Sequence, residues 1–232
     1  MVSTPKRETR NLVDRVYEHI LDQIITGMVR YGDTISIKKV AGELGVSTMP
    51  VREAVKRLEL EQVVSIKPRS FCRVRRPSHK MIMEVYELRE ALEEFAVTKT
   101  LGKVDAEAIG RLRGIVERMR SLHAEADAAV QEKKAIELDR EFHSQIGALE
   151  GSEMLNTYYR QLSLHVNMTF IHEKTYHTLE QGWSEVHAEI LRCIESEPAR
   201  AMEALQRHFG SVRNLLGARE SPGSGNEEGE ER

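Results

Sequence analysis

The sequence has 232 residues, of which 40% are hydrophobic and 31% are charged, a composition that suits one large or two small globular domains. It contains no run of 18 uncharged apolar residues, and the first ten residues have no apolar segment behind their charges. We therefore expect neither a membrane-spanning helix nor a secretory signal. The two cysteines, Cys72 and Cys193, argue against a disulfide framework, and the cytoplasm is the expected location.

The net charge of −3 divides unevenly along the chain. Residues 1–76 contain 15 Lys and Arg against 9 Asp and Glu, a net charge of +6, whereas residues 77–232 contain 19 against 28, a net charge of −9. A basic segment joined to a larger acidic one indicates that the first part alone meets a polyanion, although chance clustering would give the same numbers.

Helical periodicity marks three helices in the first region. Apolar residues recur every four positions in the first helix, which ends near Gly27, and a short second helix spans Ile37–Leu44. After a turn at Gly45, Ser47 is placed to cap a third helix. That third helix runs to about Glu61.

Two strand patterns follow the third helix. Residues 63–67 and 71–75 are rich in β-branched and aromatic side chains and flank a turn at residues 68–70. Three helices followed by a basic hairpin form the plan of a winged helix-turn-helix, in which the second helix of the helix-turn-helix enters the major groove of DNA. We expect this DNA-binding domain over residues 9–76, after a flexible N-terminus at residues 1–8.

The third helix and the hairpin carry cations and hydroxyl groups, which are the groups that bind the phosphates of DNA. On the helix they are Ser47, Thr48, Arg52, Lys56 and Arg57, and on the hairpin Lys67, Arg69, Arg73, Arg75 and Arg76. The simpler alternative is a small structural domain with solvated basic faces.

The segment Gly45–Leu58, GVSTMPVREAVKRL, resembles the signature of the GntR family of bacterial transcription regulators, and the segment Asp33–Ala41 is also similar to that family. The resemblance implies DNA contacts by Lys38, Arg52 and Arg69. The sequence departs from the family where Thr48 replaces a common arginine. It also departs where Gln62 and Ser70 replace glycines that are common in the hairpin.

The remaining sequence predicts helices without strands. Apolar residues recur at helical spacing, with breaks at glycines and at Pro198. The expected helices span residues 79–101, 105–125, 128–149, 153–177, 181–196 and 198–217. We expect a mainly α protein, with an all-α bundle over residues 81–218 that binds an effector and dimerises. A linker at residues 77–80 precedes it, and the Gly- and Glu-rich residues 219–232 are expected to form a disordered acidic tail.

Four polar residues interrupt the apolar faces of these helices. Asp139 and His143 are four residues apart and share a face, and His187 and His208 each lie among apolar residues of later helices. A buried carboxylate and three buried imidazoles require partners, which a divalent metal would supply. The alternative is a metal-free, hydrogen-bonded core.

The same four residues fit the FadR-type subfamily of GntR regulators. The segments DREFH at 139–143, VHAEIL at 186–191 and RHF at 207–209 resemble the pattern of that subfamily. Its effector domain is an antiparallel helical bundle, and many members bind a metal through one Asp and three His. The resemblance implies a divalent metal at this site, with zinc or nickel first and manganese or iron as alternatives.

Two further polar residues are candidates for contact with an effector. Arg89 lies on an apolar face, where its guanidinium could hold the carboxylate of a small organic acid or could pair with Glu93 or another buried acid. Asn167 could contribute a neutral polar contact or be a hydrogen-bonded core amide.

These features predict a transcription regulator, a repressor in most related proteins, and not an enzyme. A homodimer would bind a near-palindromic operator, and a small carboxylate beside the metal would change DNA affinity. One alternative is a metal-dependent hydrolase or lyase fused to a DNA-binding module. Another is an architectural DNA binder with a structural metal.

Overall fold

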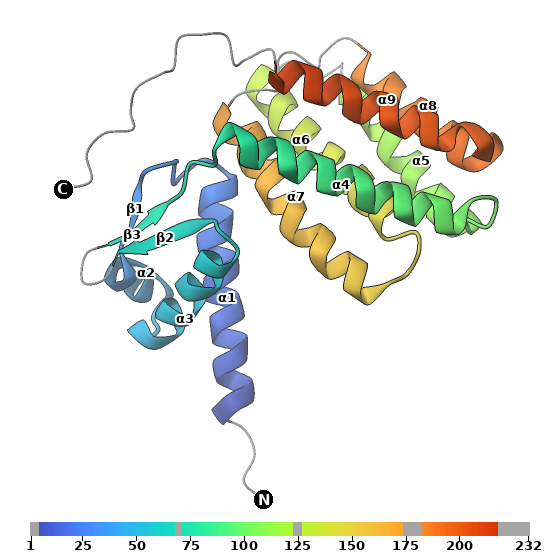
Figure 1. The fold of residues 1–232 in the computed structure, drawn as a ribbon. Helices are drawn as coiled ribbons and strands as arrows, with labels where there is room; N and C mark the ends of the chain where they lie inside the picture. The colour runs from blue at the N-terminus through green and yellow to red at the C-terminus, as the bar shows by residue number, and fades with distance from the viewer. Residues whose placement is uncertain (1–4, 68–70, 123–126, 174–181, 218–232) are drawn as a thin grey trace, which may run out of the picture. The chain divides into compact units, whose positions relative to one another are not determined.

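The computed structural model describes residues 5–67, 71–122, 127–173 and 182–217 (Figure 1). Its contacts divide the chain into two compact units. The first contains Met1–Ser78 and Leu164–Thr175, and the second contains His79–Ser163 and Tyr176–Arg232. Within the described ranges, every helix is too short or too polar to cross a membrane.

The first unit has the elements of a winged helix-turn-helix. They are α1 Pro5–Ile25, β1 Thr34–Ile35, α2 Ile37–Leu44, α3 Thr48–Leu60, β2 Val64–Lys67 and β3 Phe71–Val74. The strands form an antiparallel sheet in the order β1-β3-β2, with Thr34 opposite Arg73 and Val64 opposite Val74. The sequence did not predict β1, because two residues are too few to show a strand period. The first helix begins at Pro5, within the N-terminal segment that was expected to be flexible.

The turn between α2 and α3 is built by two adjacent backbone features. Gly45 ends α2 in the left-handed conformation, with φ of 63°, and its N–H points at the carbonyls of Ala41 and Gly42. Ser47 occupies the N-cap position of α3, but its side chain makes no capping hydrogen bond, so the predicted capping role is wrong. Gln62, where a glycine was noted as common, has a φ of 61° and therefore a conformation that favours glycine.

Apolar side chains of α1 and α3 form the core of this unit. Val51, Ala54, Val55 and Leu58 were predicted to face inward, and each is at most 1% exposed. They pack with Val16, Ile20 and Ile24 of α1, which recur at the spacing of one helical face. This packing holds α3 with its opposite face in solvent.

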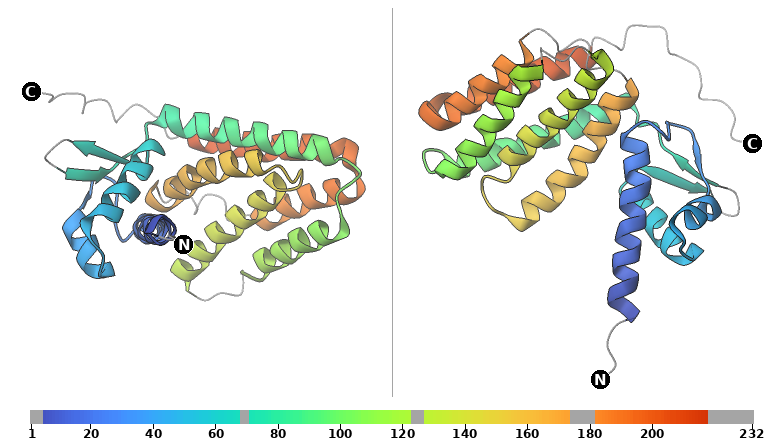
Figure 2. Two further views of the ribbon diagram at one scale, coloured as in Figure 1. Left: turned by 90° about the horizontal axis from the view of Figure 1, so that it is seen from below. Right: turned by 180° about the vertical axis from the view of Figure 1, so that it is seen from behind.

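Among the residues described, the second unit consists of helices joined by turns and contains no strand, as predicted. Its helices are α4 His79–Thr100, α5 Ala106–Ser121, α6 Ala128–Gly147, α7 Glu153–Glu173, α8 Trp183–Ser196 and α9 Pro198–Gly217. Figures 1 and 2 show these helices lying side by side in a bundle. Helix α9 packs on α4 and α8, and α6 packs on α4 and α5. The last part of α7 belongs by its contacts to the first unit.

Large apolar side chains fill the centre of the bundle, among them Phe142, Ile146, Leu112 and Leu205. Charged residues and histidines are buried with them, namely Arg89, Glu93, Asp139, His143 and His187. Burial of such groups is costly unless they are paired, so their partners identify the site.

Candidate metal centre and DNA-binding surface

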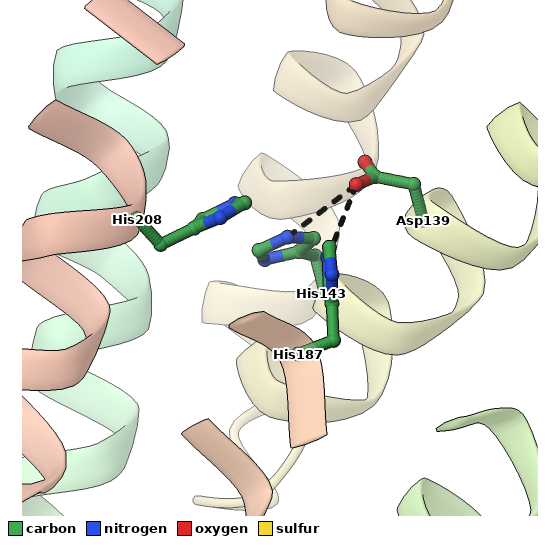
Figure 3. Close-up of side chains that lie close together, drawn as sticks. All are labelled: Asp139, His143, His187 and His208. Carbon is green, nitrogen blue, oxygen red and sulfur yellow. Dashed lines mark ion pairs between the residues drawn. The ribbon is translucent and has the colours of Figure 1, made fainter. Parts of the chain in front are cut away.

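The structure brings together the four residues that were predicted to hold a metal. Asp139 and His143 come from α6, His187 from α8 and His208 from α9, and their side chains converge in Figure 3. One potential ligand atom from each residue lies within 4.8 Å of all the others. Asp139, His143 and His187 are buried, and His208 is half-buried.

Hydrogen bonds fix the orientation of two of the imidazoles. Nδ1 of His187 lies 2.7 Å from the backbone carbonyl oxygen of Trp183, and Nδ1 of His143 lies 2.8 Å from Oε2 of Glu93. Both partners are acceptors, so each Nδ1 carries the proton. In a neutral ring this leaves a lone pair on Nε2, which is the atom that binds metals in such arrangements.

The two Nε2 atoms are buried and have no hydrogen-bond partner among the described residues. They lie 3.2 Å (His187) and 3.8 Å (His143) from Oδ1 of Asp139. When the rings are neutral, lone pairs therefore face a carboxylate, which is repulsive unless a cation lies between them. The donor set of three imidazoles and one carboxylate suits zinc or another divalent transition metal, so these residues fit the metal that the sequence predicted.

The electrostatics of the site favour the protonation states that metal binding requires. Burial lowers the pKa of His143, with the positive charge of Arg89 acting in the same direction, and burial lowers the pKa of His208 well below its ordinary value. Burial alone would raise the pKa of Asp139, but the neighbouring imidazoles and Arg89 outweigh it and lower that pKa. An ionised carboxylate of Asp139 thus faces neutral imidazoles of His143 and His208, as metal ligation requires.

Aromatic rings hold the imidazoles in place. The rings of His143 and His208 stack, with centroids 4.8 Å apart and an interplanar angle of 26°. Phe142 packs edge-on against His187 at 4.9 Å, and Phe209 packs edge-on against His208 at 5.3 Å. Rotation of the imidazoles is therefore restricted by packing as well as by hydrogen bonds.

Arg89 pairs with buried acids inside the protein, which is the alternative to an effector contact that the sequence left open. Its Nε lies 3.0 Å from Oε1 of Glu93 and 3.1 Å from the hydroxyl oxygen of Tyr159, and its Nη2 lies 3.6 Å from Oδ2 of Asp139. The side chain of Asn167 lies outside the described residues.

Sequence reasoning missed three residues that complete this site. Glu93 was considered only as a partner of Arg89, and Tyr159 and Trp183 were not singled out. The indole Nε1 of Trp183 lies 3.4 Å from Oδ1 of Asp139. The four-residue spacing of Arg89 and Glu93 was the one available signal, since it places an acid beside a buried cation.

The predicted DNA-contacting residues that the structure describes are exposed. Lys38 of α2 and the α3 residues Thr48, Arg52 and Lys56 are exposed, as is Ser47 at the start of α3. Lys56 lies 3.5 Å from Glu53, whereas within the described ranges Arg52 makes no ion pair. Arg69 lies outside the described residues.

Arg57, which was grouped with these cations, is held by other protein groups. Its guanidinium lies 3.1 Å from Asp14 and 3.2 Å from Glu61, and it stacks over the ring of Tyr17 at 3.9 Å. The charge of Arg57 is therefore used to join α1 to the end of α3.

Two family models together cover most of the chain. The model described as the FCD domain matches residues 84–211, and the model described as bacterial regulatory proteins of the gntR family matches residues 12–74. The chain belongs to the gntR family of bacterial regulatory proteins. The two matches fall on the winged helix-turn-helix and on the helical bundle, and so confirm the predicted fold class.

Relatives of this GntR protein carry the names of transcriptional regulators. The chain is 29% identical over 117 residues to an uncharacterized HTH-type transcriptional regulator of Mycobacterium tuberculosis, a match that covers 50% of this chain and 48% of the relative. It is 27% identical to the "Probable D-xylose utilization operon transcriptional repressor" of Paenarthrobacter nicotinovorans, covering 91% and 92% of the two chains. The matches span about half the length of the first of these curated relatives.

A crystal structure of a GntR transcriptional regulator from Rhodococcus sp. RHA1 has the same fold, with a TM-score of 0.76. It is 22% identical and the match covers 89% of this chain and 98% of that one. The names of the relatives support the expectation that this GntR protein is a regulator and not an enzyme.

Proposed function

We propose that this GntR protein is a repressor whose affinity for operator DNA is controlled by a small carboxylate bound beside a divalent metal. The observation that carries the proposal is the pair of buried Nε2 atoms of His143 and His187, which have no hydrogen-bond partner among the described residues and converge with His208 on the carboxylate of Asp139. When bound, the metal would act as a Lewis acid with positions open to an external ligand. Zinc or nickel suits the donor set best, and manganese or iron is also compatible with it.

The charges buried around the site support an anionic effector. Glu93 and Asp139 carry two negative charges and Arg89 carries one positive charge, so the buried groups have one negative charge in excess. A divalent cation would change this to one positive charge in excess, which a monocarboxylate would neutralise. Effector contacts by Arg89 and Asn167 remain predictions, and a carboxylate would reach Arg89 through its terminal nitrogens because Nε is engaged by Glu93.

The proposed operator is near-palindromic because the regulator is proposed to act as a homodimer in the bacterial cytoplasm. Exposed apolar side chains on two adjacent helices of the bundle support a dimer. Leu88 and Phe95 of α4 are 55% and 46% exposed, and Met154 and Tyr158 of α7 are 72% and 57% exposed. A contact with a second copy would remove this apolar area from water.

The oligomeric state can be tested by changing Phe95 to Glu and measuring the molar mass in solution by light scattering. The dimer proposal expects a shift towards monomer. As a control, Leu60→Glu changes an exposed apolar residue of the DNA-binding unit, 86% exposed, and should leave the mass unchanged.

A screen of small organic acids with the purified protein tests the effector proposal. The zinc-loaded and the metal-free protein are heated in the presence of each acid, and a ligand that binds the folded state raises the melting temperature with the logarithm of its excess over the dissociation constant. Acids that stabilise only the zinc-loaded protein are then added to the complex of this protein with an operator that has been identified by footprinting. The proposal expects a weaker complex, and an unchanged affinity with every stabilising acid would contradict it.

A further inference from the structure

Glu93 is the meeting point of three helices around the candidate metal centre. It lies on α4 and is 0% exposed. Its Oε2 accepts a hydrogen bond from Nδ1 of His143 on α6, at 2.8 Å. Its Oε1 accepts from the hydroxyl of Tyr159 on α7, at 2.6 Å, and from Nε of Arg89, at 3.0 Å.

We propose that Glu93 is the positioning residue of the metal centre. By accepting a hydrogen bond from Nδ1–H of His143, it selects the tautomer of His143 in which the lone pair of Nε2 points at the site shared with Asp139. A carboxylate acceptor also makes the imidazole a stronger electron donor than a carbonyl acceptor does. This inference rests on the proposed metal function.

The comparison with His187 shows what Glu93 contributes. Nδ1 of His187 donates to the backbone carbonyl of Trp183, which any residue at position 183 would supply. The corresponding partner of His143 is a side chain fifty positions away in the sequence. One substitution can therefore remove the orienting group of His143 and leave that of His187 in place.

Arg89 and Tyr159 hold the carboxylate of Glu93 in its orientation. Both donate to Oε1, which leaves Oε2 for His143. Burial alone would raise the pKa of Glu93, but the adjacent imidazole of His143, the charge of Arg89 and the hydroxyl of Tyr159 outweigh it and lower that pKa. The pairing of Arg89 with Glu93 thus has a consequence for the metal centre as well as for burial of the guanidinium.

The first test measures zinc affinity by competition with a chromogenic chelator, using the full chain. Glu93→Gln keeps the volume of the side chain, removes its charge and presents a donor as well as an acceptor to His143. We expect zinc binding to weaken by roughly 10- to 100-fold, the cost of losing an outer-shell partner. Tyr159→Phe keeps Glu93 but removes one of its donors, and should weaken binding less. Glu94→Gln, which changes the neighbouring residue bonded to Gln206, should leave it unchanged.

A double variant separates action through His143 from a general effect on packing. In a His143→Ala background the ligand that Glu93 orients is gone, so adding Glu93→Gln should cause no further loss of zinc affinity. If the two losses multiply instead, Glu93 acts by another route and the proposal is overturned. An affinity of Glu93→Gln within about twofold of wild type would overturn it as well.

The second test reads the tautomer directly and needs no metal. In the metal-free protein with ¹⁵N-labelled histidine, the nitrogen shifts of His143 should indicate a proton on Nδ1 in the wild type and a mixture of tautomers in Glu93→Gln. If Glu93→Gln does not fold, the same spectra of Tyr159→Phe decide, with a smaller change in the same direction expected and unchanged shifts overturning the proposal. If the wild-type protein binds no zinc, the proposed function fails, while the tautomer measurement still tests the role of Glu93.

Discussion

The charged side chains of the two candidate sites, one in each unit of this protein, have opposite placements. In the winged helix-turn-helix, Lys38 and Arg52 are exposed, and within the described ranges Arg52 makes no ion pair. In the helical bundle, Arg89, Glu93 and Asp139 are buried and bonded to one another or to neighbouring rings. A surface that meets a polyanion needs cations in solvent, whereas a site that selects a small ion or ligand needs charges that are already desolvated and oriented.

The difference has a consequence for mutations. Removing an exposed cation should reduce binding of the external partner and leave folding unchanged, because water solvates the site equally well without it. Removing one member of the buried network leaves another charge without a partner, so it should change stability and binding together. Each unit can therefore be tested with the other as an internal control.

The largest expected effect is the loss of metal from a ligand variant. His187→Ala removes one of the four converging ligands, and zinc affinity should fall by more than the roughly 10- to 100-fold that outer-shell changes cost. Elemental analysis of the purified protein should show the metal lost. As a control, His19→Ala changes a histidine of the DNA-binding unit and should keep the metal content of wild type. The same content in His187→Ala as in wild type would contradict the site.

Next in size is the loss of DNA affinity in Arg52→Ala. A side chain that contacts a base edge contributes about 1–3 kcal/mol, so affinity for the operator should fall by roughly 5- to 150-fold. Fluorescence anisotropy with a labelled operator measures it, at a fixed salt concentration. Metal content should be that of wild type. If His187→Ala weakened the complex as much as Arg52→Ala does without effector, the separation between the two units would be wrong.

The buried imidazoles predict a pH dependence for the stability of the metal-free protein. The pKa values of His143 and His208 are lowered in the folded state, so below the ordinary value of about 6.5 the unfolded chain binds protons that the folded chain does not. The free energy of unfolding should therefore fall between pH 7.5 and pH 5.5, by at most about 1.4 kcal/mol per pH unit for each imidazole. The carboxyl groups of Glu93 and Asp139 also have lowered pKa values, but their effect on the free energy of unfolding begins only near pH 4.

Urea unfolding followed by the fluorescence of Trp183, the single tryptophan of the sequence, measures this change in the bundle. The variant His143→Gln removes one of the two groups and should show a shallower pH dependence. If the free energy of unfolding of the wild type instead rose as the pH fell from 7.5 to 5.5, the imidazoles would already be protonated in the folded state. That outcome would favour a metal-free, hydrogen-bonded core.

The contrast between the two units also explains how far the sequence predicts this molecule. The helix-turn-helix was predicted closely because its signals are local: Gly45 ends α2, and four inward residues of α3 lie within eight positions. The strand β1 was missed because two residues carry no period, and the capping role of Ser47 was wrong because a residue type fixes a preference and not a hydrogen bond.

The site in the bundle was predicted in part for the same reason. Asp139 and His143 share one helix face, and a resemblance to a known family connected them with His187 and His208. The role of Glu93 could not be predicted, because its contacts with His143 and Tyr159 join positions 50 and 66 residues apart and depend on how the helices pack. Periodicity indicates that a side chain is buried but does not indicate which side chains of other helices it meets.

The smallest expected effect concerns Arg57, a cation of α3 that does not fit the contrast between exposed and buried charges. Arg57 is on α3, as Arg52 is, but its guanidinium is paired with Asp14 and Glu61 and stacks on Tyr17. Partly exposed ion pairs contribute about 0.2–1 kcal/mol and an exposed cation–π contact about 0.5–1 kcal/mol, so Arg57→Ala should lower the free energy of unfolding by about 1 kcal/mol. Urea unfolding followed by circular dichroism measures it. Arg52→Ala serves as the matched control, with a change of less than about 0.5 kcal/mol. If Arg57→Ala instead left stability unchanged and weakened operator binding as much as Arg52→Ala, the guanidinium of Arg57 would leave its protein partners for the DNA, and its pairing with Asp14 and Glu61 would describe the free protein alone.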